Sequence, residues 1–416
     1  QGNLMSATIK HIDIKGVQIP VIFEEQKSLP ILNLQLVFQN SGYIQDNNKS
    51  GLANLSSKLL NEGTKELGAT KFAEILDENA ITLTASNGFE TFVVELSNLK
   101  EQSKMGIELL TTLLKSPNFT QNSLDKLKTM QTGSLKRKEN DFDYVSNNQL
   151  KSILFKGTAL ENPSSGTIES ISKIELKDIE NFIHQTVCLE NLIIVAGGDF
   201  ELKEFEKLVK PLLETLNVGK KAQLEEVNFI SKKEEKVLIK DTQQAYIYFG
   251  SSFNINSKDE ENYKAKVASF ILGGSGFGSR LMEEIRVKRG LAYSAYGSIS
   301  INKSHSYFNG YLQTKNETAD EAKKLVGEII EDFVKNGVTN DELSAAKNFL
   351  TGSEPLRSET LSQRLNRAFT LYYRGLEPNY SQKELEKIQN LELTDLNNYI
   401  KSHNEINNLT FSIVRK

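Results

Sequence analysis

The sequence predicts an α+β protein built from two homologous domains, each a mixed β-sheet covered by helices. Its 416 residues exceed what a single hydrophobic core normally serves. A stretch of the first half recurs in the second half, and both halves mix strand-like with helix-like segments. Together these observations favour two related domains, in which helices pack on one face of a sheet.

The repeat is clearest between the segments that begin at Ile171 and Ile388. Without a gap, the two segments match at Leu176/Leu393, Asp178/Asp395, Asn181/Asn398, Ile183/Ile400 and Asn191-Leu192/Asn408-Leu409. Upstream, Thr120, Leu124 and Lys128 recur as Thr339, Leu343 and Lys347. Such a fixed offset predicts a duplication. We place the domains at 8–218 and 237–416, joined by the charged, core-poor linker 219–236.

The first domain is expected to begin with strands, because residues 8–40 alternate between apolar and polar. A helix over 51–64 follows from leucines at helical spacing and from Gly63 after them. We further predict helices over 69–79, 102–115 and 120–138, and strands in ITLTASNG and ETFVVELS. Each copy of the repeat adds a helix with an acidic cap region and a terminal strand.

Residues 271–297 of the second domain contain a glycine-rich loop, a short helix and a strand. The charged segment Ser279–Lys288 predicts the helix, which Arg289-Gly290 ends, and Leu291–Ser300 predicts the strand. Arg286 and Tyr293 therefore lie on either side of a sharp reversal, where both can face one cavity. The loop, which we expect to be flexible, has glycine at Gly273, Gly274, Gly276 and Gly278.

This stretch resembles the second domain of the M16 zinc metallopeptidases, the family that includes mitochondrial processing peptidase and pitrilysin. The family pattern is LGGG, then SSRL, then R-x-K-x-G-L-x-Y, and this chain has Leu272-Gly273-Gly274, Gly278-Ser279-Arg280-Leu281 and Arg286 to Tyr293. The resemblance implies a LuxS/MPP-like metallohydrolase fold with two domains around a chamber. It also implies that Arg286 and Tyr293 bind the peptide. The alternative is a surface helix in which Arg286 pairs with Glu283.

The first domain departs from the family where zinc should bind. Active members carry H-x-x-E-H on a helix, and a glutamate some 75 residues later completes the ligands. Here the flanking Gly51-Leu52-Ala53 and Glu62-Gly63-Thr64 are present, but the motif reads Asn54-Leu55-Ser56-Ser57-Lys58, and the third ligand falls near Gly133 or Ser134. Asn54 is a poor ligand, Ser57 is no general base at neutral pH, and the Lys58 ammonium repels a dication.

No replacement metal site is predicted elsewhere. The histidines are His11, His184, His305 and His403, and no two lie within four residues of each other. We expect His184 and His403 to face solvent at helix ends. The single cysteine, Cys188, excludes a cysteine-based zinc site and an internal disulfide. We therefore predict no cofactor in this chain.

Composition excludes other functions. The net charge is −4 with no basic stripe, so nucleic acid is not an expected partner. No run of 18 apolar residues predicts a membrane span, and the glycine loop lacks the G-K-[ST] of a phosphate site. The first residue is Gln1, so either a signal peptide has been removed or the start is not native. We expect a periplasmic or secreted protein, with a cytoplasmic location as the alternative.

We interpret the chain as the non-catalytic subunit of a heterodimeric M16 peptidase, able to form a homodimer without its partner. The partner would carry H-x-x-E-H and zinc, while this chain would close the peptide chamber and bind substrate through Arg286 and Tyr293. Three alternatives are open: a stand-alone peptide-binding protein, a structural assembly subunit like the inactive core subunits of respiratory complexes, and, least favoured, a hydrolase active alone.

Overall fold

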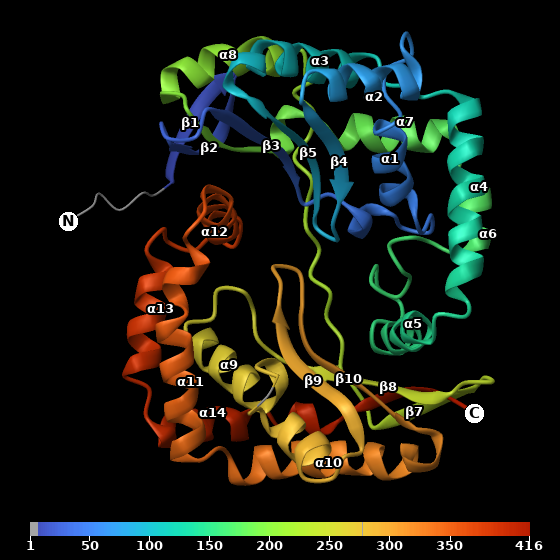
Figure 1. Ribbon diagram of the computed structural model, residues 1–416, viewed down its shortest axis with the longest axis vertical. Helices are drawn as coiled ribbons and strands as arrows, with labels where there is room; N and C mark the ends of the chain where they lie inside the picture. Colours follow the sequence, from blue (N-terminus) through green and yellow to red (C-terminus); the bar gives the residue numbers. More distant parts are fainter. Residues whose placement is uncertain (1–6, 277) are drawn as a thin grey trace. The chain divides into compact units, whose positions relative to one another are not determined.

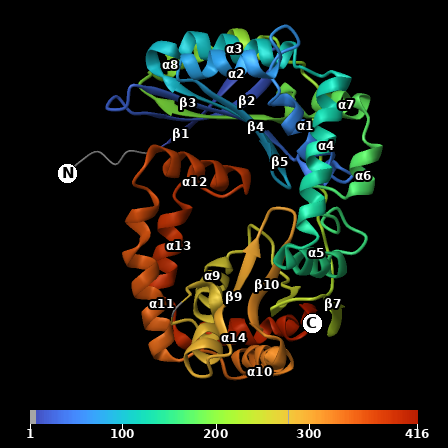
Figure 2. The same ribbon diagram turned by 45° about the vertical axis from the view of Figure 1, so that its right-hand side comes forward.

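The computed structural model describes residues 7–276 and 278–416, which form two compact units (Figures 1 and 2). Unit 1 contains the described residues up to Lys136, with Pro163–Leu224 and Arg357–Tyr373. Unit 2 contains Arg137–Asn162, Glu225–Leu356 and Arg374–Lys416. The units thus differ from the contiguous domains we predicted, because each sequence half gives one segment to the other unit. The C-terminal part of the predicted linker, from Glu225 on, belongs to unit 2.

The described part of unit 1 forms a six-stranded mixed sheet with the order β1-β2-β6-β3-β5-β4. Only the β2–β6 pair is parallel among the strand pairs of this sheet. The strands are β1 (Thr8–Ile14), β2 (Val17–Glu25), β3 (Ile31–Gln39), β4 (Thr82–Asn87), β5 (Thr91–Leu99) and β6 (Leu192–Gly198).

Helices cover both faces of the unit 1 sheet. Alternate residues such as Leu34, Leu36 and Val94 form the main core beneath the helices of one face. The opposite face has a smaller core, in which Ile22 and Val195 pack against α12 (Leu361–Tyr373). The remaining helices are α1 (Leu52–Leu60), α2 (Gly68–Glu78), α3 (Ser103–Lys115), α4 (Gln121–Lys138), α6 (Ile168–Lys173), α7 (Leu176–Thr186) and α8 (Leu202–Glu214).

Unit 2 repeats this topology. Its five described strands have the order β7-β11-β8-β10-β9, and the single parallel pair among them is β11–β7. The order matches β2-β6-β3-β5-β4 of unit 1, so the duplication predicted from sequence extends to strand pairing. The strands are β7 (Glu234–Ile239), β8 (Gln244–Ser252), β9 (Ala292–Ile301), β10 (Ser306–Lys315) and β11 (Thr410–Arg415).

One face of the unit 2 sheet carries the core of that unit, while α5 (Phe142–Leu154) packs on β8 and β11 from the other face (Figure 2). The position of α5 therefore corresponds to that of α12 in unit 1. On the core side lie α9 (Asn262–Ser269), α10 (Ala319–Asn336), α11 (Asn340–Gly352), α13 (Tyr380–Gln389) and α14 (Leu393–Ser402), together with two π-helical segments, η4 (Phe270–Gly274) and η5 (Met282–Val287).

A buried ion pair fastens α12 to the sheet of unit 1. Arg364 donates from Nε and Nη2 to the Glu24 carboxylate, with the shortest contact at 2.7 Å. The Glu24 side chain is only 3% exposed. A carboxylate this deep in a protein needs its partner, since removing one member of a buried pair leaves an unpaired charge.

We predict that Arg364→Met lowers the free energy of unfolding by about 3–5 kcal/mol, the cost of an uncompensated buried carboxylate. Urea denaturation followed by circular dichroism measures this loss. The double variant Glu24→Leu/Arg364→Met should recover most of it, because no charge is then stranded. Lys177→Met, which removes an exposed pair with Glu175 in the same unit, should change stability by less than about 0.5 kcal/mol. If Arg364→Met alone were as stable as the wild type, the ion pair would not hold α12 on the sheet as described.

Candidate functional site

Helix α1 carries the three positions where active M16 members hold zinc and its general base. Its start is fixed by Asp46, whose carboxylate accepts hydrogen bonds from the backbone N–H groups of Gly51 at 3.0 Å and Ala53 at 2.9 Å. Burial raises the pKa of Asp46 to about 7, against the opposing effect of these hydrogen bonds. Leu55 and Leu59 anchor the helix in the core of unit 1, so its polar residues are held in fixed positions.

The polar residues at the motif positions of α1 form hydrogen bonds with one another and with α4, and they do not form a set of metal ligands. Lys58 donates from Nζ to Oε1 of Gln131, a buried residue of α4. The Gln131 amide in turn donates to the Ser165 carbonyl at 2.8 Å and to Oδ1 of Asn54 at 3.5 Å. Ser57 donates to the backbone carbonyl of Asn54 at 2.8 Å. The place of the zinc motif is thus filled by amides, a hydroxyl and an ammonium.

This donor set does not fit zinc. An ammonium has no lone pair to give, and amide oxygens are weak ligands for a metal that prefers imidazole, thiolate and carboxylate. Across the residues that the structure describes, histidine, cysteine, aspartate and glutamate nowhere gather in a group of three that could hold a metal ion.

Gln131, rather than Ser134, is the residue of α4 that reaches the motif. We placed the third ligand position at Gly133 or Ser134 by counting along the chain. The structure puts Gln131, almost one helical turn earlier, in contact with both Asn54 and Lys58. The lengths of the segments between α1 and α4 decide which residue of α4 contacts the motif. Counting residues with the typical spacing of the family does not take the segment lengths of this chain into account.

The expectation that His403 faces solvent was wrong. Its ring stacks on Phe253 with centroids 4.3 Å apart, and Nδ1 lies 2.7 Å from Oε1 of Glu405. His184 is exposed, as expected.

An asparagine side chain occupies the outer edge of β4, the last strand of the unit 1 sheet. Asn61, which follows α1, donates from Nδ2 to the Ala85 carbonyl at 2.9 Å and accepts the Ala85 N–H at 2.7 Å. A primary amide that pairs with both backbone groups imitates a neighbouring strand. Because unpaired edges recruit other strands, we infer that Asn61 closes this edge at Ala85.

In unit 2 the structure brings Arg286 and Tyr293 together. The guanidinium carbon of Arg286, on η5, lies 4.6 Å from the ring centroid of Tyr293, on β9. Tyr293 is 82% exposed. Pairing between β9 and β10 shifts from Leu312↔Ala295 to Thr314↔Ala292, so two residues of β9 oppose Gln313 alone. Such a bulge redirects a side chain out of the regular alternation of a strand, which explains why Tyr293 points into solvent.

The glycine loop fits closely against β9. A side chain at Gly273 would come within 2.8 Å of the backbone of Gly297, so only glycine permits this approach. Gly274 ends η4. Gly276 and Gly278 have φ of 73° and 88°, values that favour glycine. The flexibility of this loop stays a prediction, which in addition spans residue 277, outside the described residues.

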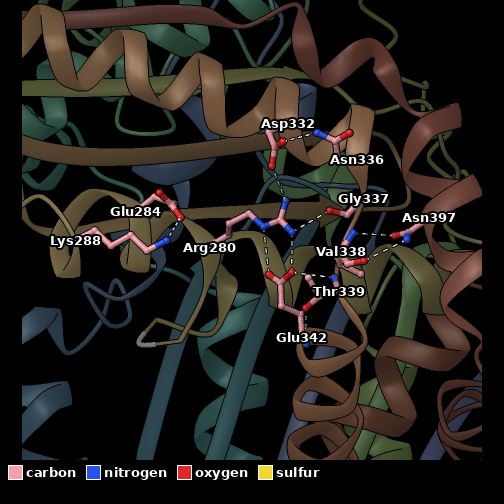
Figure 3. Close-up of polar contacts among 10 residues, drawn as sticks. All are labelled: Arg280, Glu284, Lys288, Asp332, Asn336, Gly337, Val338, Thr339, Glu342 and Asn397. Carbon is pink, nitrogen blue, oxygen red and sulfur yellow. Dashed lines mark hydrogen bonds and ion pairs between the residues drawn. The ribbon is translucent and has the colours of Figure 1, made fainter.

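Arg280 ties the segment that carries Arg286 to the junction of α10 and α11 (Figure 3). Its guanidinium makes a two-pronged pair with Glu342, at 2.7 and 3.2 Å, and donates to the Gly337 carbonyl at 2.9 Å. Burial acts to raise the pKa of Glu342, but the hydrogen bonds from Arg280 and Thr339 prevail and lower it. Glu284 pairs with Lys288 and Arg289, so η5 is held at several points.

Comparison with known proteins identifies the family to which the chain belongs. A family model described as insulinase (peptidase family M16) matches residues 21–168, and one described as peptidase M16 inactive domain matches residues 173–350. The chain therefore belongs to the M16 peptidase family.

Among relatives, the chain is 44% identical to the non-peptidase homolog YmxG of Helicobacter pylori, over 99% of this chain and 95% of the relative. It is 23% identical to the uncharacterized zinc protease YmxG of Bacillus subtilis, over 76% and 77% of the two chains. The fold is similar to that of a peptidase M16 inactive domain from Pseudomonas fluorescens, with a TM-score of 0.90, 23% identity and 98% of each chain covered.

A second similar structure is a protease from Helicobacter pylori, with a TM-score of 0.84, 17% identity, and 99% and 100% of the chains covered. Within the M16 family, this chain is a non-peptidase homologue. None of the helices in the described residues combines the length and apolar character needed to cross a membrane.

We predict that zinc binding returns when four positions are restored together: Asn54→His, Ser57→Glu, Lys58→His and Gln131→Glu. Two histidines four apart on one helix face, with a carboxylate from α4, complete a tetrahedral site that keeps one position open. Competition with a chromogenic chelator measures the affinity. In a matched variant that carries Ser134→Glu instead of Gln131→Glu, we expect at least about tenfold weaker binding, because second-helix ligands act only where they reach the metal. Equal affinity in the two variants would contradict the assignment of Gln131.

We also predict that Asn61→Ala exposes the edge of β4. The Ala85 amide loses its acceptor, so its hydrogen exchange should accelerate by about tenfold, which corresponds to about 1.4 kcal/mol of lost protection. Exchange measured by mass spectrometry or NMR reports this change. Asn79→Ala is the control, because the Asn79 side chain donates to the Ile75 carbonyl within its own helix end, and this variant should leave Ala85 protected. Unchanged exchange at Ala85 in the Asn61 variant would show that the pairing does not close the edge.

Proposed function

We propose that this chain is the non-catalytic, substrate-binding subunit of a heterodimeric M16 zinc metallopeptidase. The partner is an M16 subunit that carries H-x-x-E-H, the zinc ion and the cleavage chemistry. This chain closes the peptide chamber and contributes Arg286 and Tyr293 to substrate binding. The observation that carries the proposal is a contrast within one molecule: the zinc position is filled by Lys58 and Gln131, while Arg286 and Tyr293 lie together and Tyr293 faces solvent.

The geometry of the Arg286–Tyr293 pair suits recognition of a peptide carbonyl. The Arg286 guanidinium carbon lies over the Tyr293 ring, and a guanidinium in this position can bond to a carbonyl oxygen through N–H groups in its own plane. The phenol ring holds that plane in place, and its hydroxyl is a second donor on an exposed side chain. Donors positioned where negative charge develops on a carbonyl oxygen stabilise the transition state of peptide cleavage. The zinc that polarises water belongs to the partner.

The test reconstitutes the pair. The chain is mixed with an H-x-x-E-H subunit that co-purifies with it, and cleavage of an internally quenched peptide is followed. We expect Arg286→Ala to lower kcat/KM by about a hundredfold, the usual effect of removing one such donor. Tyr293→Phe keeps the ring that supports Arg286 and removes only the hydroxyl, so a smaller loss is expected.

Lys383→Ala is the control, because Lys383 is an exposed cation on α13 that pairs with Glu377, and this variant should leave the rate unchanged. If Arg286→Ala and Tyr293→Phe both cleave at the wild-type rate, the assigned role is wrong. If affinity purification recovers no metallopeptidase while the chain still binds peptides, the chain is a stand-alone peptide-binding protein instead.

A further inference from the structure

Three tyrosines form a row across the sheet of unit 2. Tyr311 on β10 is paired in register with Tyr248 on β8 and with Tyr296 on β9. The ring centroids are 5.4 Å apart for Tyr248 and Tyr311, and 5.7 Å apart for Tyr311 and Tyr296. Directly paired residues share a face, and this face is opposite to the one where Ile247 and Phe249 enter the core. We call these three residues the tyrosine row.

The row extends beyond the part of the sheet that α5 covers. Helix α5 packs on β8 and β11, where Phe142 meets Tyr246 and Ser146 bonds to Ser412. The Tyr311 side chain is 40% exposed, and Tyr248 and Tyr296 are half-buried. The middle of the row therefore presents aromatic surface to solvent.

The fold itself does not require tyrosine at these positions. The repeat aligns Val195 of β6 with Ser412 of β11. The strand residues paired with these two, Gln35 and Tyr248, are therefore equivalent. The corresponding row of unit 1 is Gln35, Glu95 and Thr84, paired in the same way. The equivalent positions of the unit 1 sheet hold small or polar residues. Packing of the sheet therefore does not explain why unit 2 has tyrosine at all three positions.

The charge around the row favours a cation. The Tyr248 hydroxyl donates to Oδ1 of Asp143 at 2.9 Å, and the Gln313 amide donates to Oδ2 at 3.0 Å. Burial and the charges of Asp143 and Asp141 raise the pKa of the Tyr248 phenol. A phenol that donates to a carboxylate stays protonated and keeps an electron-rich ring, whose face attracts cations. The negative charges of Asp143 and Asp141, at one end of the row, also attract a cation.

The row also adjoins the proposed substrate-binding pair. Gln313, which bonds to Asp143, is the residue opposite the bulge that contains Tyr293. A peptide held at Arg286 and Tyr293 therefore lies beside the strands that carry Tyr296 and Tyr311.

We propose that the tyrosine row is a specificity site for a lysine or arginine side chain of an extended peptide. The cationic group lies against the exposed ring of Tyr311, within the field of Asp143 and Asp141. This inference rests on the proposed function, because it assumes that the chain binds peptides, and it adds the class of side chain that the chain prefers.

The test measures binding of two fluorescein-labelled peptides to the full chain by fluorescence anisotropy. Both are short unstructured alanine–serine peptides, one with a central lysine and one with norleucine, which has the same carbon chain without the ammonium. We expect the lysine peptide to bind about fivefold tighter or more, a ratio typical of a cation on an aromatic face. Tyr311→Leu should abolish the ratio by weakening the lysine peptide alone, and Tyr311→Phe, which keeps the aromatic face, should retain most of it.

Tyr263→Leu is the matched control, because Tyr263 lies on α9 and packs against the core on the other side of the sheet. It should leave the ratio unchanged. If the wild type binds both peptides equally, or if Tyr311→Leu keeps the preference for lysine, the tyrosine row is not the site and the inference fails alone. If the chain binds neither peptide, the proposed function fails with it.

Discussion

The contact between Lys58 and Gln131 decides what this molecule can do. A singly and a doubly positive charge 4 Å apart repel by about 8 kcal/mol at an effective dielectric constant of about 20. A hydrogen bond to a charged group contributes only about 1.5–3 kcal/mol. The hydrogen bond to Gln131 therefore stabilises the Lys58 ammonium in this position. A zinc ion bound beside that ammonium would be destabilised by the larger repulsion. With Asn54 and Ser57 at the neighbouring positions, no lone pair of the right kind replaces the lost ligands.

The duplicated fold explains how the zinc-motif positions of unit 1 and the Arg286–Tyr293 pair of unit 2 can vary independently within one chain. Each unit repeats the same strand order and buries its own core, and each is completed by a helix from the other sequence half: α12 in unit 1 and α5 in unit 2. Substitutions in α1 and α4 leave the packing of the unit 2 sheet intact. The surfaces have accordingly diverged: unit 1 carries the filled motif and the edge closed by Asn61, and unit 2 carries Arg286, Tyr293 and the tyrosine row.

Much of the fold was predictable because its signals are local or repeated. Alternation marked the strands, leucine spacing marked the helices, and the constant offset marked the duplication. The proximity of Arg286 and Tyr293 followed from a helix end and a strand start on either side of one turn. The sequence did not predict that α5 packs on the unit 2 sheet and α12 on the unit 1 sheet. Each helix covers a sheet of the other sequence half, and this packing depends on which sheet face fits the apolar surface of the helix.

The details of the site needed the structure for similar reasons. Gln131 was missed because loop lengths set which turn of α4 meets α1. Asn61 looks like an ordinary residue after a helix, and its pairing with Ala85 joins segments 24 residues apart. The tyrosine row needs the register of three strands, although the alternation Tyr246-x-Tyr248 signalled an aromatic face. His403 was misplaced because its stacking partner, Phe253, lies far away in sequence.

The central claim is that this chain holds a peptide but cannot polarise water to cut it. The most direct test is elemental analysis of the isolated, purified chain after incubation with zinc and gel filtration, combined with a peptidase assay on the same sample. The account predicts far less than one zinc per chain and no hydrolysis above background. One bound zinc per chain together with peptide hydrolysis, both lost on chelation, would contradict it.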